Sequence, residues 1–429
     1  MDRSAFGNKF GADSGILQLM GDLGAAMSSA EKTYMLGGGN PARIPAVEQL
    51  FRERMIELLD DGTRFERTIG EYDGPQGHSG FIDALAELLR SELGWPITPA
   101  NIALTNGSQT AFFILFNIFA GKYENRPDRR VLLPLAPEYI GYADIGIDRE
   151  LFVASRPSID HLDEHMFKYR IDADALAQID QAEDIGAICV SRPTNPTGNV
   201  LTDTEIDQLS NLARQRGIPL IIDSAYGTPF PNIIFTDATP IWDKGIIVTM
   251  SLSKLGLPGL RTGIVIADED VIRSVTGANA ILSLATGSIG PALAEGLVRS
   301  GTILEVSRRH IQPFYKNRAD DAMQWLSQYM DGVPYRVHTP EGAIFLWLWF
   351  PDLPIDSETL YQRLKQRRVL VIAGHHFFPG LHDDWRHRYE CIRVTYSQDP
   401  DTVREGIRII AEEVRQAYAE GVSSAAANS

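Results

Sequence analysis

The sequence has few cysteines, no long apolar run and no excess of positive charge. Its two cysteines, Cys189 and Cys391, lie in apolar segments without metal-ligand spacing, which predicts buried free thiols and a reduced, cytoplasmic protein. The most apolar run, AIFLWLWF at residues 343–350, is too short for a membrane-spanning helix, and residues 1–15 lack the apolar core of a signal peptide. A formal net charge of −16 argues against nucleic acid or an anionic membrane as the main partner.

What is present is an alternation of strand-like and helical segments. Apolar runs such as IGAICVS, IPLIID and GIIVTMS each end in polar or turn-forming residues, and segments with helical spacing, such as TDTEIDQLSNLARQRG, lie between some of them. This alternation predicts an α/β fold with a largely parallel sheet that is covered by helices on both faces. From about Tyr315 onward, a long helix, further strands and a terminal helix predict a second, smaller α+β domain.

Three polar residues come at or just after the ends of three of these strand-like runs. They are Asn195, Asp223 and Lys254, and they lie 28 and 31 residues apart. Each separation is close to one strand–helix–strand unit of about 30 residues. Because ligands of parallel sheets bind beyond the carboxyl ends of the strands, we expect the three side chains to share one site.

The segment 251–261, SLSKLGLPGLR, surrounds Lys254 with two serines, two glycines and Arg261. Most lysines are solvated surface charges. Here, however, Arg261 can bind a phosphate through two parallel hydrogen bonds, and the glycines let the backbone approach a ligand closely. A lysine in such a cationic, partly desolvated site has a lowered pKa and can form an imine with an aldehyde. The segment therefore predicts a lysine that reaches a phosphate-bearing cofactor.

Asp223 and Asn195 each have an ordinary structural explanation as well. Asp223 can cap the turn SAYG that follows it, or it can pair with a protonated ring nitrogen of a cofactor. Tyr226, three residues later, is placed to bond the phenolic oxygen of the same ring. Asn195 lies in RPTNPTGN, a strong turn pattern that needs no ligand. The predicted position of both residues beside Lys254 favours a shared ligand site.

Two further segments are compatible with a cofactor. Gly107, Ser108 and Gln109 open a predicted helix in LTNGSQTAFF, where free N–H groups and the helix dipole favour a phosphate. Tyr139 in APEYIGY follows another strand-like run and either packs in the core or stacks on a flat ring.

Arg393 and a histidine-rich segment complete the candidate residues. Arg393 lies in the strand-like CIRVTY, where a buried guanidinium needs either a structural salt bridge or a substrate carboxylate. We prefer the carboxylate, since the other residues suggest an amino-acid site. The histidines of GHHFFPGLHDDWRH lack the spacing of a structural zinc site, so we predict a loop without metal.

Together, SLSKLGLPGLR, RPTNPTGN and IIDSAYG resemble the fold-type I, pyridoxal-phosphate-dependent aminotransferases of class I/II, and the likeness covers nearly the whole chain. MLGGGNPARIP, YDGPQG, PLAPEYIGYAD, EGAIFLWLWF and HHFFPG are similar to the valine–pyruvate aminotransferases within that family. The resemblance implies a seven-stranded, mostly parallel sheet with TGIVIA as its antiparallel strand. It also implies an N-terminal arm with part of the small domain (1–60), a large cofactor-binding domain (61–315) and a small C-terminal domain (316–429).

The resemblance further implies a role for each matching residue. Lys254 would hold pyridoxal 5′-phosphate as an imine, and Asp223 would pair with its pyridine nitrogen. The ring oxygen would be bonded by Tyr226 and Asn195, and the ring would stack on Tyr139. The phosphate would be bound by Gly107, Ser108, Gln109, Ser251, Arg261 and, from the neighbouring subunit of a homodimer, Tyr72. The substrate α-carboxylate would be bound by Arg393, Asn195 and the backbone near Gly39.

The expected activity is a ping-pong amino transfer between valine or alanine and pyruvate or 2-oxoisovalerate, with the Lys254 amine as general base on Cα. No second arginine stands out as a partner for a side-chain carboxylate, although Arg43 and Arg192 remain candidates. One alternative is a lyase or decarboxylase on the same scaffold, which only substrate orientation would distinguish. Another is a non-catalytic sensor, but the chain ahead of Tyr72 is too short for the separate DNA-binding module that such regulators carry.

Overall fold

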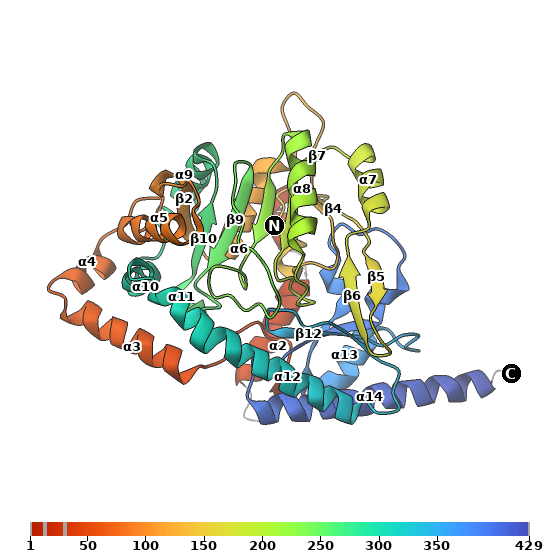
Figure 1. Ribbon diagram of the computed structural model, residues 1–429. Coiled ribbons are helices and arrows are strands. Elements are labelled where there is room, and N and C mark those ends of the chain that lie inside the picture. Colours follow the sequence, from red (N-terminus) through yellow and green to blue (C-terminus); the bar gives the residue numbers. More distant parts are fainter. Residues whose placement is uncertain (1, 12–14, 29–31, 428–429) are drawn as a thin grey trace.

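The computed structural model describes residues 2–11, 15–28 and 32–427 of the 429-residue chain. Two sheets, one of seven strands and one of six, organise it, and Figure 1 shows helices packed around both. Two short strands, β1 (Tyr34–Met35) and β13 (Val369–Leu370), form a separate parallel pair. The pair places residues 34–35 of the N-terminal segment beside residues 369–370.

The larger sheet has the strand order β2-β10-β9-β8-β7-β3-β4. Its strands are β2 (Ile102–Asn106), β3 (Arg130–Leu133), β4 (Phe152–Ala154), β7 (Ile185–Ser191), β8 (Leu220–Asp223), β9 (Ile246–Ser251) and β10 (Thr262–Ile266). Strand β10 is antiparallel to both of its neighbours, and the other neighbouring strands are parallel. The seven-stranded, mostly parallel sheet and its antiparallel strand TGIVIA are therefore confirmed.

Helices cover this sheet. They are α5 (Ser79–Leu93), α6 (Ser108–Phe119), α7 (Ala173–Ala182), α8 (Asp203–Arg216), α9 (Glu269–Ser283) and α10 (Ile289–Arg299). In Figure 1, α5, α9 and α10 lie near the β2 edge, while α7 and α8 lie toward the opposite edge. Helix α3 (Pro45–Asp60) precedes them in the sequence and packs against α10.

Helix α8 shows how local sequence positions the site. Its N-cap, Thr202, exchanges hydrogen bonds with Glu205 in a capping box, and Gly217 ends the helix in the left-handed conformation, with φ 64°. Its buried residues, among them Ile206 and Leu209, form the face that packs on β7 and β8. The crossover makes β7 and β8 parallel neighbours, so both strands end at the same edge of the sheet.

The smaller sheet has the order β14-β15-β12-β11-β6-β5. Its strands are β5 (Ser158–His161), β6 (Met166–Arg170), β11 (Arg336–His338), β12 (Phe345–Trp349), β14 (Ile372–Ala373) and β15 (Cys391–Thr395). The remaining helices are α1 (Ala5–Phe10), α2 (Gly15–Ser28), α4 (Arg64–Gly70), α11 (Thr302–Val306), α12 (Gln312–Tyr329), α13 (Ser357–Gln366) and α14 (Pro400–Ala427). In Figure 1, α12 runs along the lower side of the molecule toward α14.

Two elements cross the predicted domain boundaries. The β5–β6 hairpin belongs to the 61–315 segment in sequence, yet β6 pairs in parallel with β11 of the smaller sheet. Helix α12 continues across position 315 without a break. The division into 1–60, 61–315 and 316–429 stays a prediction.

None of the helices in the described part of the chain is both long enough and apolar enough to cross a membrane.

Candidate active site

The strand ends of the larger sheet open into a cavity of about 410 Å³. Ser191 and Asp223, the last residues of β7 and β8, are paired neighbours in the sheet, and both line the cavity together with Ser251 at the end of β9. The predicted site residues that line it are Gly39, Ser108, Gln109, Tyr139, Asn195, Asp223, Tyr226, Ser251, Lys254, Arg261 and Arg393. Parallel strands thus bring together residues that are far apart in the sequence.

A larger hollow of about 630 Å³ lies between α1 and the segment from Gly121 to Glu150. None of the predicted site residues lines it, and its Arg130 is paired with Glu150 at 3.3 Å. The chemistry therefore points to the smaller cavity at the strand ends.

Lys254 follows β9 and extends its amine into the cavity. Its Nζ donates to the carbonyl oxygen of Gly39 at 2.5 Å and lies 5.1 Å from the ring centroid of Tyr226. Burial, followed by the nearby guanidinium groups of Arg393 and Arg261, lowers the pKa of Lys254 to about 8 against the opposing effect of Asp223. A larger fraction of this amine is neutral at pH 7 than of an exposed lysine, so it is a better nucleophile and base.

Asp223 is held by two donors at the end of β8. Tyr142 donates its hydroxyl to Oδ2 at 2.7 Å, and the backbone N–H of Ala225 donates to Oδ1 at 2.9 Å. Burial raises the pKa of Asp223, whereas these hydrogen bonds and Lys254 lower it. The carboxyl group is therefore buried but oriented, as a partner for a ring cation must be.

Tyr142 is a residue that the sequence analysis missed. It ends the 3-10 turn η2 (Ile140–Tyr142) three residues after Tyr139, and the two rings meet edge to face with centroids 5.4 Å apart. The second tyrosine of APEYIGY was the available signal, but a tyrosine near a strand end is more often a core residue.

Arg393 is a buried cation on β15. Its Nη1 donates to Asn195 Oδ1 at 2.7 Å, and its Nη2 donates to the Gly37 carbonyl at 2.7 Å. Its guanidinium carbon lies 3.9 Å from the Phe345 ring centroid, and its Nε has no hydrogen-bond partner. Burial lowers the pKa of Arg393 to about 10. Among the described residues no carboxylate pairs with it, so the structure holds a positive charge that an anionic ligand can neutralise.

The N-terminus of α6 forms a cradle for an anion. Gly107 precedes the helix with φ 84°, and the helix has no side-chain cap, so its first N–H groups are available to a ligand. A Cβ at Gly107 would lie 2.1 Å from Arg261 Nη2, so only glycine lets this guanidinium lie over the helix start. The guanidinium, the helix end and the hydroxyl of Ser251 fit a phosphate group.

Gln109 makes a different contact from the rest of the cradle. Its side-chain amide donates to the Gly141 carbonyl at 2.8 Å, which ties α6 to η2. The hydroxyl of Ser108 donates to the Met250 carbonyl at 3.2 Å, at the end of β9. Both contacts hold the segments that surround the cavity.

Helix α2 also contributes to the cavity, which the sequence analysis did not predict. Ile16, Met20 and Gly24, spaced four residues apart along the helix, line the cavity with Met35 and Gln398. The four-residue spacing places the three helix positions on one face. That spacing was visible in the sequence, but it does not tell which surface the helix face covers.

Tyr72 lies outside the cavity. It follows α4, and 83% of its side chain is exposed. Within one subunit its hydroxyl is therefore not part of the predicted phosphate site.

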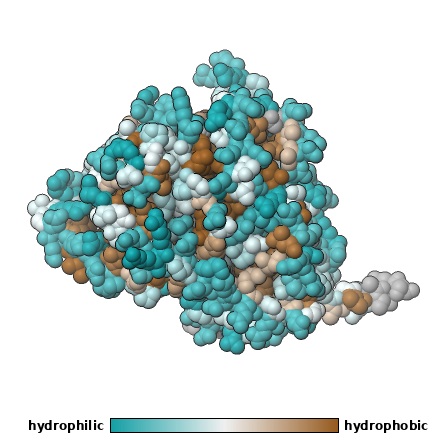
Figure 2. All heavy atoms as spheres, viewed as in Figure 1, coloured by the Kyte–Doolittle hydropathy of each residue, from teal (hydrophilic) through white to brown (hydrophobic). Residues whose placement is uncertain are grey.

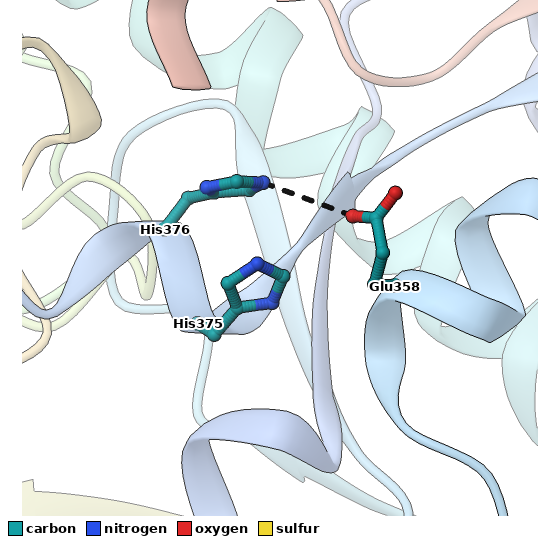
Figure 3. Close-up of side chains that lie close together, drawn as sticks. All are labelled: Glu358, His375 and His376. Carbon is teal, nitrogen blue, oxygen red and sulfur yellow. Dashed lines mark ion pairs between the residues drawn. The ribbon is translucent and has the colours of Figure 1, made fainter. Parts of the chain in front are cut away.

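Two histidines of the histidine-rich segment, His375 and His376, lie close to Glu358. His375 and His376 lie on the 3-10 turn η5 (Gly374–Phe377), and Figure 3 shows the His376 ring directed toward Glu358 on α13, with the His375 ring beside them. The His376 Nε2 lies 3.9 Å from Glu358 Oε2, and His375 Nδ1 lies 3.3 Å from Ser357 Oγ. These contacts explain the pair without an ion, and the prediction of no metal stays a prediction.

Comparison with known proteins gives one consistent result. Residues 38–410 match the family model described as aminotransferase class I and II. The valine–pyruvate aminotransferase of Escherichia coli K12 is 50% identical over 420 residues, which cover 98% of this chain and 100% of that protein. A putative amino-acid aminotransferase structure from Psychrobacter arcticum 273-4 has a TM-score of 0.95 and 47% identity and covers 98% and 99% of the two chains.

A second solved structure agrees with these. The valine–pyruvate aminotransferase of Salmonella typhimurium LT2 has a TM-score of 0.86 and 49% identity and covers 95% of this chain and 100% of its own. Aminotransferases with this fold use pyridoxal 5′-phosphate, an aldehyde that carries a phosphate, and the cavity offers an amine and a phosphate cradle for it. The chain therefore belongs to the class I and II aminotransferases, pyridoxal-phosphate enzymes that transfer amino groups between amino acids and 2-oxo acids.

Proposed function

We propose that the protein transfers the amino group of a small or branched aliphatic amino acid, valine or alanine, to pyruvate or 2-oxoisovalerate. The observation that carries this proposal is the charge of the cavity. Its described lining includes three cationic side chains, Lys254, Arg261 and Arg393. Lys254 is assigned to the cofactor aldehyde and Arg261 to the phosphate, which leaves Arg393 for one substrate carboxylate.

The two other arginines considered from the sequence are engaged elsewhere. Arg43 is 88% exposed and pairs with Glu48 at 2.6 Å. Arg192 is buried and pairs with Asp203 at 2.5 Å. Neither lines the cavity, so a second carboxylate on the substrate would have no cation there. The apolar lining, which includes Phe112 and Ile140, supports an aliphatic side chain instead, as does the likeness to valine–pyruvate aminotransferases.

Arg393, which is held by Asn195, binds the α-carboxylate of the substrate, and its buried charge favours an anion strongly. The phosphate is bound by Ser108, Ser251, Arg261 and the helix start at Gly107, and Gln109 supports this cradle through its bond to η2. Tyr139 would pack against the ring, and Tyr226 and Asn195 would bond its oxygen; all three residues line the cavity.

Pyridoxal 5′-phosphate, when bound, supplies an electrophilic aldehyde carbon and a cationic ring that accepts an electron pair. Asp223 would hold the proton on the ring nitrogen, because its carboxylate is oriented by Tyr142 and Ala225. Lys254 would hold the cofactor aldehyde, and its free amine would serve as the base for the proton on the substrate Cα. The relatives reported above are aminotransferases, which favours this outcome over the lyase and sensor alternatives.

A panel of amino donors tests the substrate class. With pyruvate or 2-oxoisovalerate as acceptor, we expect 2-aminobutyrate to react within about 200-fold of alanine and within about 200-fold of valine in kcat/KM, because each of these pairs differs by one methylene, worth only ~1–3 kcal/mol in an apolar pocket. We expect aspartate and glutamate to react at least about 100-fold more slowly than valine, because their second carboxylate would be buried without a partner. A preference for aspartate or glutamate would overturn the aliphatic assignment while leaving the reaction type intact.

We further propose a homodimer in which Tyr72 reaches the phosphate of the neighbouring subunit. Tyr72 is exposed, and apolar side chains near it in sequence are exposed as well: Ile56 and Leu59 on α3 and Ile69 on α4. Figure 2 shows apolar residues on the surface in the region of α3 and α4. Exposed apolar surface of this kind is typical of a protein–protein interface.

Mixed dimers test the origin of Tyr72. Tyr72→Phe should weaken cofactor binding by about 10- to 100-fold, the usual effect of losing one hydrogen bond to a charged group. In a heterodimer of Tyr72→Phe and Lys254→Ala subunits, one site combines an intact Lys254 with an intact Tyr72 only if Tyr72 acts across the interface. We therefore expect half of the sites to bind the cofactor with wild-type affinity, as measured by the visible absorbance of the lysine-bound cofactor during titration. If no site in the heterodimer reaches wild-type affinity, Tyr72 does not act in this way.

A cytoplasmic location is also proposed. Both cysteines are free and buried, and burial raises the pKa of both thiols well above the ordinary value. Buried free thiols without a disulfide framework support a reducing compartment.

A further inference from the structure

Glu138 is a buried carboxyl group that the roles above leave unused. It directly precedes Tyr139 and is 1% exposed. The backbone N–H of Ser191 donates to its Oε1 at 2.9 Å, and the Ser191 hydroxyl donates to its Oε2 at 2.6 Å. Both carboxyl oxygens therefore bond Ser191, the last residue of β7, and the backbone N–H of Tyr139 also bonds the carboxyl group.

Ser191 connects Glu138 to the proposed catalytic residues. It is paired with Asp223 across β7 and β8, it lines the cavity, and it lies four positions before Asn195. Glu138 itself does not line the cavity. Any effect that it has on the cofactor or substrate therefore passes through Ser191 and the neighbouring strand ends.

Glu138 and Asp223 are two buried carboxyl groups whose surroundings differ. Among the described residues no cation forms an ion pair with Glu138, and a buried carboxylate without such a partner is unfavourable. Burial and the nearby Asp223 raise the pKa of Glu138 to about 8, against the opposing effect of its bonds to Ser191. Asp223 has Tyr142, Ala225 and the cationic Lys254 to stabilise its ionised form. These contacts favour the ionised form at Asp223 and the protonated form at Glu138.

We propose that Glu138 is a positioning residue of the transamination site, whose carboxyl group fixes Ser191 at the end of β7 and leaves Asp223 as the carboxylate that faces the cofactor ring. This inference rests on the site proposed above. In the structure the Ser191 hydroxyl donates to Glu138 Oε2, the direction that suits an ionised carboxylate. When Glu138 is protonated, its O–H can donate to the Ser191 hydroxyl oxygen instead, which frees the hydroxyl hydrogen of Ser191 for the cavity and removes a second negative charge from the surroundings of Asp223.

Two neutral substitutions separate hydrogen bonding from charge. Glu138→Gln keeps an oxygen for the Ser191 N–H and an amide N–H for the Ser191 hydroxyl, so it reproduces the protonated acid. Glu138→Leu is also uncharged but makes neither bond. In the holoenzyme we expect Glu138→Gln to retain kcat within about twofold of wild type, and Glu138→Leu to lose at least about tenfold in kcat, as for one lost hydrogen bond.

A spectroscopic readout distinguishes positioning from simple loss of structure. Without any amino acid present, the visible absorbance of the lysine-bound cofactor is titrated against pH in each variant. We expect the titration midpoint to be unchanged in Glu138→Gln and displaced in Glu138→Leu, because the end of β7 then moves relative to Asp223. Thermal unfolding checks that each variant is folded. If Glu138→Leu itself does not fold, Ser191→Ala serves as the second variant and should displace the midpoint from the wild-type value.

Each outcome bears on the proposal. A Glu138→Gln enzyme as impaired as Glu138→Leu would show that the charge matters and would overturn the proposal. A wild-type midpoint and kcat in Glu138→Leu would overturn it as well. The midpoint is measured without substrate, so an error in the assigned amino acid does not affect it. Absence of any lysine-bound absorbance in the wild type would contradict the proposed site itself.

Discussion

Lys254→Ala is expected to abolish turnover while leaving the protein folded and able to bind pyridoxal 5′-phosphate without a covalent bond. The substitution removes the amine that lies between Gly39 and Tyr226, and with it both the imine and the base for Cα. General base catalysis alone contributes about 10²–10⁴-fold, so kcat should fall by at least about 10³-fold when both functions are lost. The fold should persist, because truncating this side chain leaves the phosphate cradle at α6 intact.

The measurement combines kinetics with chemical trapping. Borohydride reduction of the wild-type holoenzyme should fix the cofactor to the peptide that contains Lys254, and the variant should take up no label. Lys244→Ala, which removes an exposed lysine just ahead of β9, is the matched control and should keep wild-type kcat. A label on another lysine, or a Lys254→Ala enzyme with appreciable turnover, would contradict the assignment.

Asp223→Asn is expected to keep the cofactor and to lose about 10²–10³-fold in kcat, the usual cost of removing one preorganised electrostatic partner. The amide has nearly the shape of the carboxylate, so Ala225 and Tyr142 can still hold it. It carries no negative charge, however, and cannot stabilise a protonated ring nitrogen. The cofactor content from absorbance, together with kcat and KM, separates loss of the charge from loss of binding.

Tyr142→Phe is the companion variant. It removes the 2.7 Å hydrogen bond to Asp223 but leaves the carboxylate charge in place. We expect a kcat about tenfold below wild type, near the lower value for a hydrogen bond to a charged group.

Near-normal kcat in Asp223→Asn would mean that Asp223 serves only as the acceptor of the turn at Ala225.

Much of the fold was predictable because it follows from local patterns. Apolar runs that end in turn residues identified β7, β8 and β9 of the larger sheet, and TGIVIA was assigned as the antiparallel strand through the family resemblance. The smaller sheet was less predictable. Its β5–β6 hairpin lies between β4 and β7 in sequence, but it pairs with β11 about 170 residues later, as Val337 aligned with Met166 shows. Strand pairing over such a distance depends on which sheet edge is free, and no local pattern records that.

The cavity likewise combines features that the local sequence predicts with features that it does not. Asn195, Asp223 and Lys254 were placed together because parallel strands of similar spacing end at one edge. The family resemblance placed Arg393, Asn195 and the backbone near Gly39 at one carboxylate, but local patterns did not indicate their direct bonds: the Asn195–Arg393 bond joins positions 198 residues apart, and the Arg393–Gly37 bond joins positions 356 apart. Such contacts arise only when the two sheets and the N-terminal segment pack on one another.

By itself, the sequence determined the alternating α/β architecture, the order of the strand ends and the residue types at those ends, because periodicity, caps and turns act within a few residues. Only the tertiary structure decided which buried groups face each other: Tyr142 with Asp223, Glu138 with Ser191, and the α2 face over the cavity. The physical reason is burial. Removal from water forces each polar group to find a partner, and the identity of that partner depends on long-range packing that local sequence patterns do not encode.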